Sequence, residues 1–547
     1  MAPYSVVSGA RGVMDGLLAD TRLHIPPEVA ERAQRDVKFT GNPEPFLPVP
    51  FRIVEALAGL KGLEAAFATA IAEERYGVNA GTATVDVEHA ALFLFSTFLA
   101  RINGKVPNDP SLTAAGGPVK DTDIHHSFKN RYRQLATNCY RTKDGKYYYT
   151  HGSLDARATM KILGMDPDRT DLVETKDILK AYGEAVAQFT AAELDEKIQA
   201  AGLPGTICYS IDEFLATEQG KAIADAPVYE LSSTPGPKVT WPSVPPNTPR
   251  QALTGIKVLD LTRVIAGPVI GRGLAEHGAT VLRITSPNLP DLQGIVPDLH
   301  AGKYSAHVDL DTAEGRATLA ALVRDADVLV DGYRPGSLAR RGFSRDAVRA
   351  LNPALVYVRE NCYGWRGPWA SRAGWQQIAD AASGVSALYA DKLGHAGEAI
   401  QPIFPSADYG SGAAGVVGTL QALYQRARAG GVFDVDVSLL QYNLYELSLG
   451  LYPDAVWERV RAPAERLRHN WDVVMMMGGV GPSLRAARPE LFTRADLWQV
   501  LAAPTYGPEG SVRILRPVVR FAHLPVELGK GPSQNGDDAA AWPALGK

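Results

Sequence analysis

The chain has 547 residues, of which 46% are hydrophobic and 21% charged, with a formal net charge of −4. One hydrophobic core rarely serves more than roughly 250 to 300 residues, so we expect at least two domains. The balanced charge, without long blocks of one sign, argues against nucleic acid and anionic membranes as partners. The three cysteines show no C-x-x-C spacing, which predicts neither a disulfide framework nor a cysteine-rich metal site, and we expect no metal.

Neither the ends nor the interior of the sequence resembles a targeting or membrane-spanning segment. The first residues lack a basic segment followed by a long apolar core, and no run of about 18 apolar residues occurs. The final residues, ALGK, do not match a peroxisomal signal. We therefore predict a cytoplasmic protein that does not enter membranes.

A proline-rich stretch divides the sequence. Residues 233–250 contain six prolines, which hold the backbone extended and exclude a continuous helix. We therefore predict an amino-terminal half at 1–232, this linker, a second domain at 251–528 and a loose tail at 529–547.

The two halves share one faint similarity. Residues 62–92 resemble residues 415–444, and the tripeptide Val-Asp-Val at 85–87 matches the one at 435–437. An amphipathic helix followed by a strand also recurs by chance, so an old duplication and a coincidence stay equally open.

From residue 256 onward, strand and helix patterns alternate. The strand patterns cover 256–262, 279–285, 327–333 and 355–361. The helical patterns between them cover 269–278, 312–326 and 344–351. Regular βα units of this kind predict a parallel sheet with helices on both faces. The fold class is therefore α/β, with a Rossmann-like large domain beside a smaller α+β domain.

Two predicted strand ends carry features that suit phosphate groups. The first is the loop Val264, Ile265 and Ala266, after which a glycine and Pro268 begin a helix with free N–H groups. A plain turn between strand and helix is the alternative. The second is the arginine-rich turn at 331–343, where guanidinium groups would pair with phosphate oxygens if they are not simply solvated.

Asp408 precedes a glycine-rich opening of a long predicted helix. The simplest interpretation is a helix N-cap. The same geometry suits a carboxylate nucleophile, with Gly410 and Gly412 leaving room for a thioester carbonyl and for oxyanion contacts.

Six ordered blocks of sequence together resemble the family III CoA-transferases, which include formyl-CoA transferases, carnitine CoA-transferases and α-methylacyl-CoA racemases. The blocks are VLDLTRVIAGP, ATVLRI, GKYSAHVDLDTAEGR, ADVLVDGYRPGSLARRGF, SADYGSGAAG and DVDVSLL. The amino-terminal half, with a hairpin predicted at 138–152, looks like the family's small domain and its flanks. The resemblance implies acyl-CoA and carboxylic acid substrates, no permanently bound cofactor, and a homodimer.

Carried over residue by residue, the resemblance makes Asp408 the catalytic aspartate that forms a covalent intermediate. It implies that CoA is held by Val264, Ile265, Ala266, Arg283, Lys303 and Arg340. The departures are a missing glutamate soon after Arg283 and a Gly-Tyr pair at 332–333 where many members have Asn-Phe or a close variant. These departures imply rearranged CoA contacts.

The main alternative function is racemisation. Racemases of the family use a histidine upstream of the aspartate, whereas this chain has Trp375 and Gln376 there, and His395 lies in a separate loop. Proton exchange at an α-carbon needs two titratable groups, so the missing histidine favours transfer. An α-methylacyl-CoA racemase and a non-catalytic CoA-ester-binding protein remain alternatives.

Overall fold

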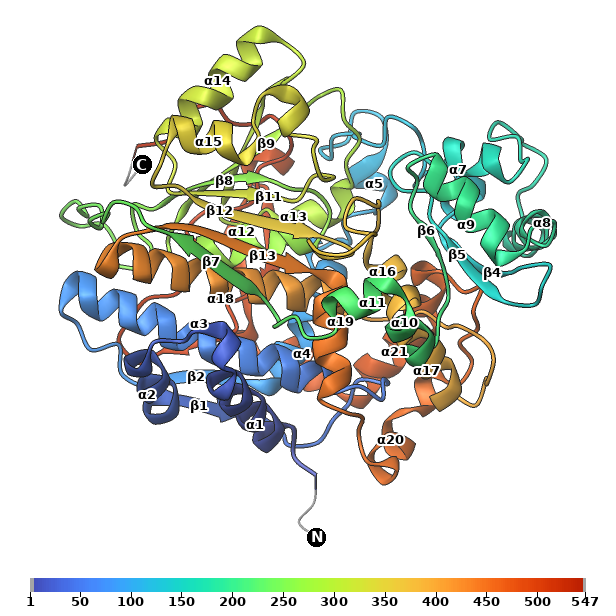
Figure 1. Cartoon of the computed structure of the whole chain (residues 1–547), viewed down its shortest axis with the longest axis horizontal. Coiled ribbons are helices and arrows are strands. Elements are labelled where there is room, and N and C mark those ends of the chain that lie inside the picture. The colour runs from blue at the N-terminus through green and yellow to red at the C-terminus, as the bar shows by residue number, and fades with distance from the viewer. Residues whose placement is uncertain (1–3, 545–547) are drawn as a thin grey trace.

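The computed structural model describes residues 4–544 and centres on a seven-stranded sheet (Figure 1). The strand order is β10-β9-β8-β11-β12-β13-β7, and all neighbours are parallel except β7, which runs antiparallel to β13. The strands are β7 (Glu230–Thr234), β8 (Lys257–Leu261), β9 (Thr280–Thr285), β10 (Lys303–His307), β11 (Val328–Asp331), β12 (Val356–Asn361) and β13 (Val432–Ser438). The predicted parallel sheet is confirmed.

Helices cover both faces of this sheet because successive strand residues point to opposite sides. In β8, Val258 packs into the main core beneath α12, whereas Leu259 packs with Leu319 of α14 in a second core. The covering helices include α12 (Ala266–Glu276), α14 (Ala313–Arg324), α15 (Arg345–Leu351) and α18 (Ser406–Ala429). The α/β fold class is therefore confirmed.

The amino-terminal half begins with a helical layer and a small sheet. The sheet has the order β1-β2-β16, and its last strand comes from the far end of the chain. The elements are α1 (Val6–Ala19), α2 (Pro27–Asp36), β1 (Val37–Thr40), α3 (Ile53–Tyr76), β2 (Ala83–Asp86), α4 (Val87–Phe93) and β16 (Val519–Phe521). Helix α3 is buried on all sides over most of its length and packs against α18, so it is a central helix of the whole molecule (Figure 1).

A smaller α+β region follows and has its own hydrophobic core. The predicted hairpin is present, since β4 pairs antiparallel with β5 around Gly145, whose φ is 80°. The region contains β4 (Asn138–Arg141), β5 (Tyr147–Thr150), β6 (Gly205–Ile207), α7 (Arg157–Ile162), α8 (Thr175–Val186) and α9 (Ala191–Ala200).

Further helices and a third small sheet belong to the rest of the described chain. The sheet has the order β14-β15-β3. These elements are α16 (Gln376–Ser383), α17 (Val385–Lys392), α19 (Leu439–Ser448), α21 (Val473–Ala487), β3 (Arg101–Ile102), β14 (Trp498–Ala502) and β15 (Ser511–Leu515). Among residues 4–544, no helix combines the length and apolarity needed to cross a bilayer.

The linker and the tail differ in part from their expected form. Strand β7 includes the first two linker residues, and residues 235–250 then form neither helix nor strand, as their prolines require. In the expected loose tail, Asn535 is buried, and its Oδ1 accepts a hydrogen bond from Arg283 Nη1 at 2.7 Å. This part of the tail is therefore packed into the large domain.

Candidate active site

A cavity opens at the carboxyl ends of β8, β11 and β12. It encloses about 770 Å³, its open mouth included, and is lined by the loops after these strands and by the start of α18. The chain order of the sheet reverses between β8 and β11. Open α/β sheets bind ligands at such switch points, so this cavity is the candidate active site.

The loop after β8 lines the cavity with Val264, Ile265 and Ala266, as the sequence predicts. Val264 has a φ of 69°, in the left-handed region that β-branched residues rarely adopt. No side chain caps the α12 helix that follows, so its first N–H groups are free for an anion. Backbone strain of this kind concentrates at ligand-binding loops.

Asp408 lies at the third position of α18 and lines the same cavity. Its side chain makes no hydrogen bond with any described residue, and Pro405 occupies the N-cap position. The N-cap interpretation of Asp408 is therefore wrong. Burial, together with the negative charges of Glu360 and Asp380, raises its pKa well above the usual value for a carboxyl.

Two further acids surround Asp408. Glu360, at the end of β12, also lines the cavity, and burial together with Asp331 raises its pKa to about 8. Asp380 is buried, and burial raises its pKa to about 7 although Asn443 Nδ2 donates a hydrogen bond to it at 2.9 Å. The sequence analysis missed both acids. The one available signal was Glu360's position at the carboxyl end of a predicted strand.

Three arginines, Arg263, Arg334 and Arg372, line the cavity. Arg263 donates to the carbonyl of Pro290 at 3.0 Å and Arg334 to that of Gly202 at 2.9 Å. Neither forms an ion pair within residues 4–544, so both keep charge for an anionic ligand. Arg334 lies in the predicted arginine-rich turn, whereas Arg263 and Arg372 were not anticipated.

Arg340 lies outside the cavity lining. It is exposed, and its Nη2 donates to Ser337 Oγ at 3.2 Å. Its neighbour Arg341 pairs with Asp311 at 2.9 Å. A role of Arg340 in CoA binding therefore stays a prediction.

Arg283 and Lys303, the other two predicted CoA contacts, are fully buried in internal ion pairs. Arg283 pairs with Asp291 at 2.5 Å, and Lys303 Nζ lies 2.7 Å from Asp260 Oδ2. Lys303 also donates to the carbonyl of Pro268 at 2.7 Å. Neither cation lines the cavity in this arrangement, because each neutralises a carboxylate inside the domain.

We expect Lys303→Met to weaken folding far more than substrate binding. The variant leaves Asp260 buried without its cation, which costs about 3–5 kcal/mol. Denaturant unfolding measures the loss, and steady-state kinetics on the folded fraction should give a KM for acyl-CoA within about twofold of the original. In the double variant with Asp260→Asn, stability should partly return. A large rise in KM at unchanged stability would contradict the structural role.

Gly410 and Gly412 allow close packing of α18. A Cβ on Gly410 would lie 1.8 Å from Cζ of Tyr442, and one on Gly412 would lie 2.6 Å from Cβ of Val269. Both glycines lie beyond the first turn of the helix, where N–H groups bond carbonyls four residues back. The expected oxyanion contacts therefore have no free N–H donors at these two residues, and the structure supports a packing role.

The other side of the cavity includes residues from distant segments. Trp375 lines it and stacks on His151, with ring centroids 5.6 Å apart, and the amino-terminal half contributes Ser153. His395 does not line the cavity, and its Nε2 lies 3.2 Å from the carbonyl of Glu465. The structure thus places no histidine among the cavity residues.

The fold and the cavity define an α/β protein with a candidate ligand site at the switch point of its parallel sheet. Residues 253–472 match the model of CoA-transferase family III. The chain is 37% identical to the acetyl-coenzyme A transferase nodX of Hypoxylon pulicicidum, over 95% of this chain and 90% of that protein. It is 33% identical to an acyl-CoA transferase of Gibberella moniliformis, over 78% of this chain and 76% of the relative.

Among solved structures, the orthorhombic form of Rv3272 from M. tuberculosis aligns with 54% of this chain and all of its own, at 22% identity and a TM-score of 0.42. The coverage and identity of the two sequence relatives decide the classification. The protein belongs to CoA-transferase family III. It is an enzyme of the CoA-transferase type, whose substrates are CoA esters.

Proposed function

We propose that the enzyme moves CoA from an acyl-CoA donor to a carboxylic acid through a covalent intermediate on Asp408. The observation that carries this proposal is a carboxylate without hydrogen bonds that faces a cavity at the strand switch point. Arg263 and Arg334 supply positive charge for the phosphates of CoA, and the free start of α12 supplies N–H donors.

The proposed steps need no oxidant, reductant or net proton. The Asp408 carboxylate attacks the thioester carbonyl, the C–S bond breaks, and CoA leaves as a thiolate with a mixed anhydride left on the enzyme. The thiolate attacks the aspartyl carbonyl of this anhydride, which forms an aspartyl-CoA thioester and releases the donor acid as a carboxylate. The acceptor carboxylate then displaces CoA to form a second anhydride, and the returning thiolate attacks the acceptor carbonyl. The new acyl-CoA departs and the Asp408 carboxylate is restored.

Mass spectrometry tests this route directly. The purified enzyme is incubated with acyl-CoA esters and treated with hydroxylamine, which converts an aspartyl thioester or anhydride to a hydroxamate, and its peptides are mapped. A relative named acetyl-coenzyme A transferase makes acetyl-CoA the first donor to use. A hydroxamate on the Asp408 peptide supports the proposal, whereas turnover without any adduct would remove it.

Glu360→Gln should shift the pH dependence of transfer. Asp408 reacts as a carboxylate, so kcat/KM rises with pH through its raised pKa. Removing the nearby negative charge lowers that pKa, so the acidic limb of the profile moves to lower pH. Glu509→Gln, at an exposed surface position, is the matched control and should leave the profile unchanged. An acidic limb that stays in place or moves upward would contradict this coupling.

The presence of both Glu360 and Asp408 in the cavity favours racemisation as a second candidate function. Glu360 and Asp408 face one cavity, and two titratable groups are what exchange of an α-proton requires. An α-methylacyl-CoA racemase would incorporate deuterium from solvent into the α-position without an acceptor acid. Exchange without any covalent adduct would favour the racemase, and binding of CoA esters with neither reaction would favour a non-catalytic role.

Several finer assignments stay predictions from the sequence. These are the homodimer, the cytoplasmic location, the division at residue 232, and the CoA contacts of individual residues. Light scattering tests the first, and the KM values of single variants at the cavity test the last. The donor and acceptor acids are to be determined by the adduct experiment.

A further inference from the structure

Helices α3 and α18 have the same length and carry an acidic residue and two glycines at the same helix positions. Each has 24 residues, with a carboxylate at the third position and glycines at the seventh and tenth. The matched pairs are Glu55 with Asp408, Gly59 with Gly412, and Gly62 with Gly415. The faint sequence repeat, which begins at Gly62 and Gly415, therefore has a counterpart in the folded chain, and the match between the helices extends back to Glu55 and to Asp408, the proposed nucleophile.

The matched glycines make equivalent contacts. A Cβ on Gly59 would lie 2.3 Å from Val13 of α1, just as one on Gly412 would lie 2.6 Å from Val269 of α12. At the tenth position, Gly62 approaches α1 and Gly415 approaches α12 in the same manner. Helix α1 is therefore the counterpart of α12.

The strands that follow these helices also correspond. Strand β2 pairs parallel with β1 and antiparallel with β16, and β13 pairs parallel with β12 and antiparallel with β7. Each central strand leads into a helix with a side-chain cap, provided by Asp86 before α4 and by Ser438 before α19. Two units with the same order of elements thus lie back to back through α3 and α18 (Figure 1).

The two units exchange their closing strands. Strand β7 precedes the second unit in the sequence but is separated from β13 by almost the whole large domain, and β16 returns from the end of the chain to β2. A Pro-Val pair precedes both closing strands, at 227–228 and at 517–518. Chance similarity of one helix and one strand does not account for this shared topology.

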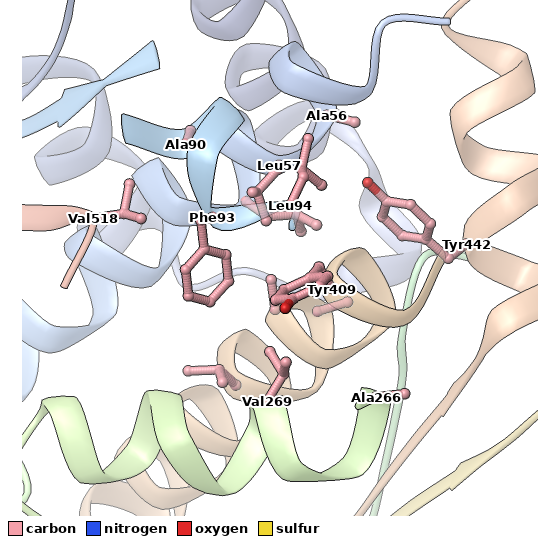
Figure 2. Packing of buried hydrophobic residues seen from close by; sticks show 14 of the residues in the cluster. Ala56, Leu57, Ala90, Phe93, Leu94, Ala266, Val269, Tyr409, Tyr442 and Val518 are labelled. Carbon is pink, nitrogen blue, oxygen red and sulfur yellow. The ribbon is translucent and has the colours of Figure 1, made fainter. Parts of the chain in front are cut away.

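We propose that α1 to α4, completed by β16, are a second and degenerate copy of the catalytic unit, in which Glu55 occupies the place of Asp408 and serves as a structural anchor. The proposal rests on the proposed function of Asp408. Figure 2 shows the packing between the copies, with Tyr409 of α18 between Val269 of α12 and Leu94, which directly follows α4. The chain then carries a single reactive carboxylate.

The surroundings of Glu55 explain why it would be inert. Its side chain is fully buried, Tyr4 Oη donates to Oε1, and Tyr452 Oη donates to Oε2 at 3.1 Å. A Cβ on Gly9 of α1 would lie 2.7 Å from Cγ of Glu55, so this helix covers the carboxyl. Asp408 is also buried, but its carboxyl group lines the cavity and forms no hydrogen bond with any described residue. Glu55 instead links Tyr4, in the segment before α1, to Tyr452, in the segment after α19.

Peptide mapping of the unmodified enzyme with acetyl-CoA and hydroxylamine tests the proposal. We expect one adduct per chain, on the Asp408 peptide and not on the Glu55 peptide. Glu55→Gln should keep the adduct and a kcat within about twofold, and should melt at a lower temperature. An adduct on Glu55, two adducts per chain, or loss of the Asp408 adduct in folded Glu55→Gln would overturn the proposal.

A tyrosine pair keeps the test decisive if Glu55→Gln does not fold. Tyr452→Phe removes one hydrogen bond to Glu55 and should lower the melting temperature by about 1–3 °C. Tyr442→Phe is the matched control, because its buried Oη has no partner in the described residues, and it should melt like the parent. Equal melting of both variants would overturn the anchor role. Absence of an adduct on both peptides would instead remove the proposed function, while the melting result still decides the role of Glu55.

Discussion

Asp408→Asn should reduce kcat for CoA transfer by roughly 10³-fold or more, since an amide cannot attack the thioester. The variant should still fold and bind CoA esters. Asp408 lies beside Glu360 and Asp380, which with burial raise its pKa, so removing its ionisable group relieves repulsion and should not lower the melting temperature. Kinetics, calorimetric binding of CoA and thermal melting measure the three quantities.

Asp391→Asn provides the matched control for this experiment, because Asp391 is an exposed aspartate in α17. It should leave kcat, CoA binding and melting unchanged. Near-normal transfer by Asp408→Asn would show that another group carries the reaction. Loss of CoA binding would show instead that Asp408 holds the substrate.

Gly410→Ala should have the second-largest effect, which is a loss of folding stability. The added Cβ would lie 1.8 Å from Cζ of the buried Tyr442, so α18 and α19 must separate, and overpacking of this kind costs about 1–3 kcal/mol or more. The start of α18 carries Asp408, so displacing the helix should also lower kcat. Thermal melting and kinetics of the soluble fraction measure both effects.

Gly478→Ala is the matched control for a glycine within a helix. Gly478 lies in α21, and a Cβ there would have no neighbour within 4 Å. This variant should be equally or more stable, because alanine favours the helix. Replacing Tyr442 by Leu in the Gly410→Ala background should recover part of the loss. Unchanged melting of Gly410→Ala alone would contradict the close contact.

The sequence predicted the large domain well because its signals are local. Buried parallel strands and amphipathic helices alternate between residues 256 and 361, and each predicted strand or helix overlaps an observed one, whereas β10 at Lys303–His307 was not predicted. The loop at Val264 and the carboxylate at Asp408, which the sequence indicated from strand and helix ends, both line the cavity, and their roles stay predictions.

Contacts between distant residues were not predictable in this way. The family resemblance implied that Arg283 and Lys303 contact CoA, but their partners Asp291 and Asp260 neutralise them in the interior. Glu360 lies at the carboxyl end of a predicted strand, but only the packing of α18 against β12 brings it to the cavity with Asp408. Side-chain charge alone does not reveal whether a residue faces solvent, a ligand or a buried partner.

The sequence by itself determined the α/β class, the βα order of the large domain, the family and the candidate nucleophile, because periodicity and ordered motifs are encoded over short distances. The tertiary structure alone decided which charges remain free in the cavity and which are paired inside the domain. It also decided that β7 and β16 each complete the other unit's sheet. Strand pairing and burial depend on residues hundreds of positions apart. The tertiary structure, and not the local sequence pattern, therefore places the Asp408 carboxyl at the cavity and covers the Glu55 carboxyl inside the protein.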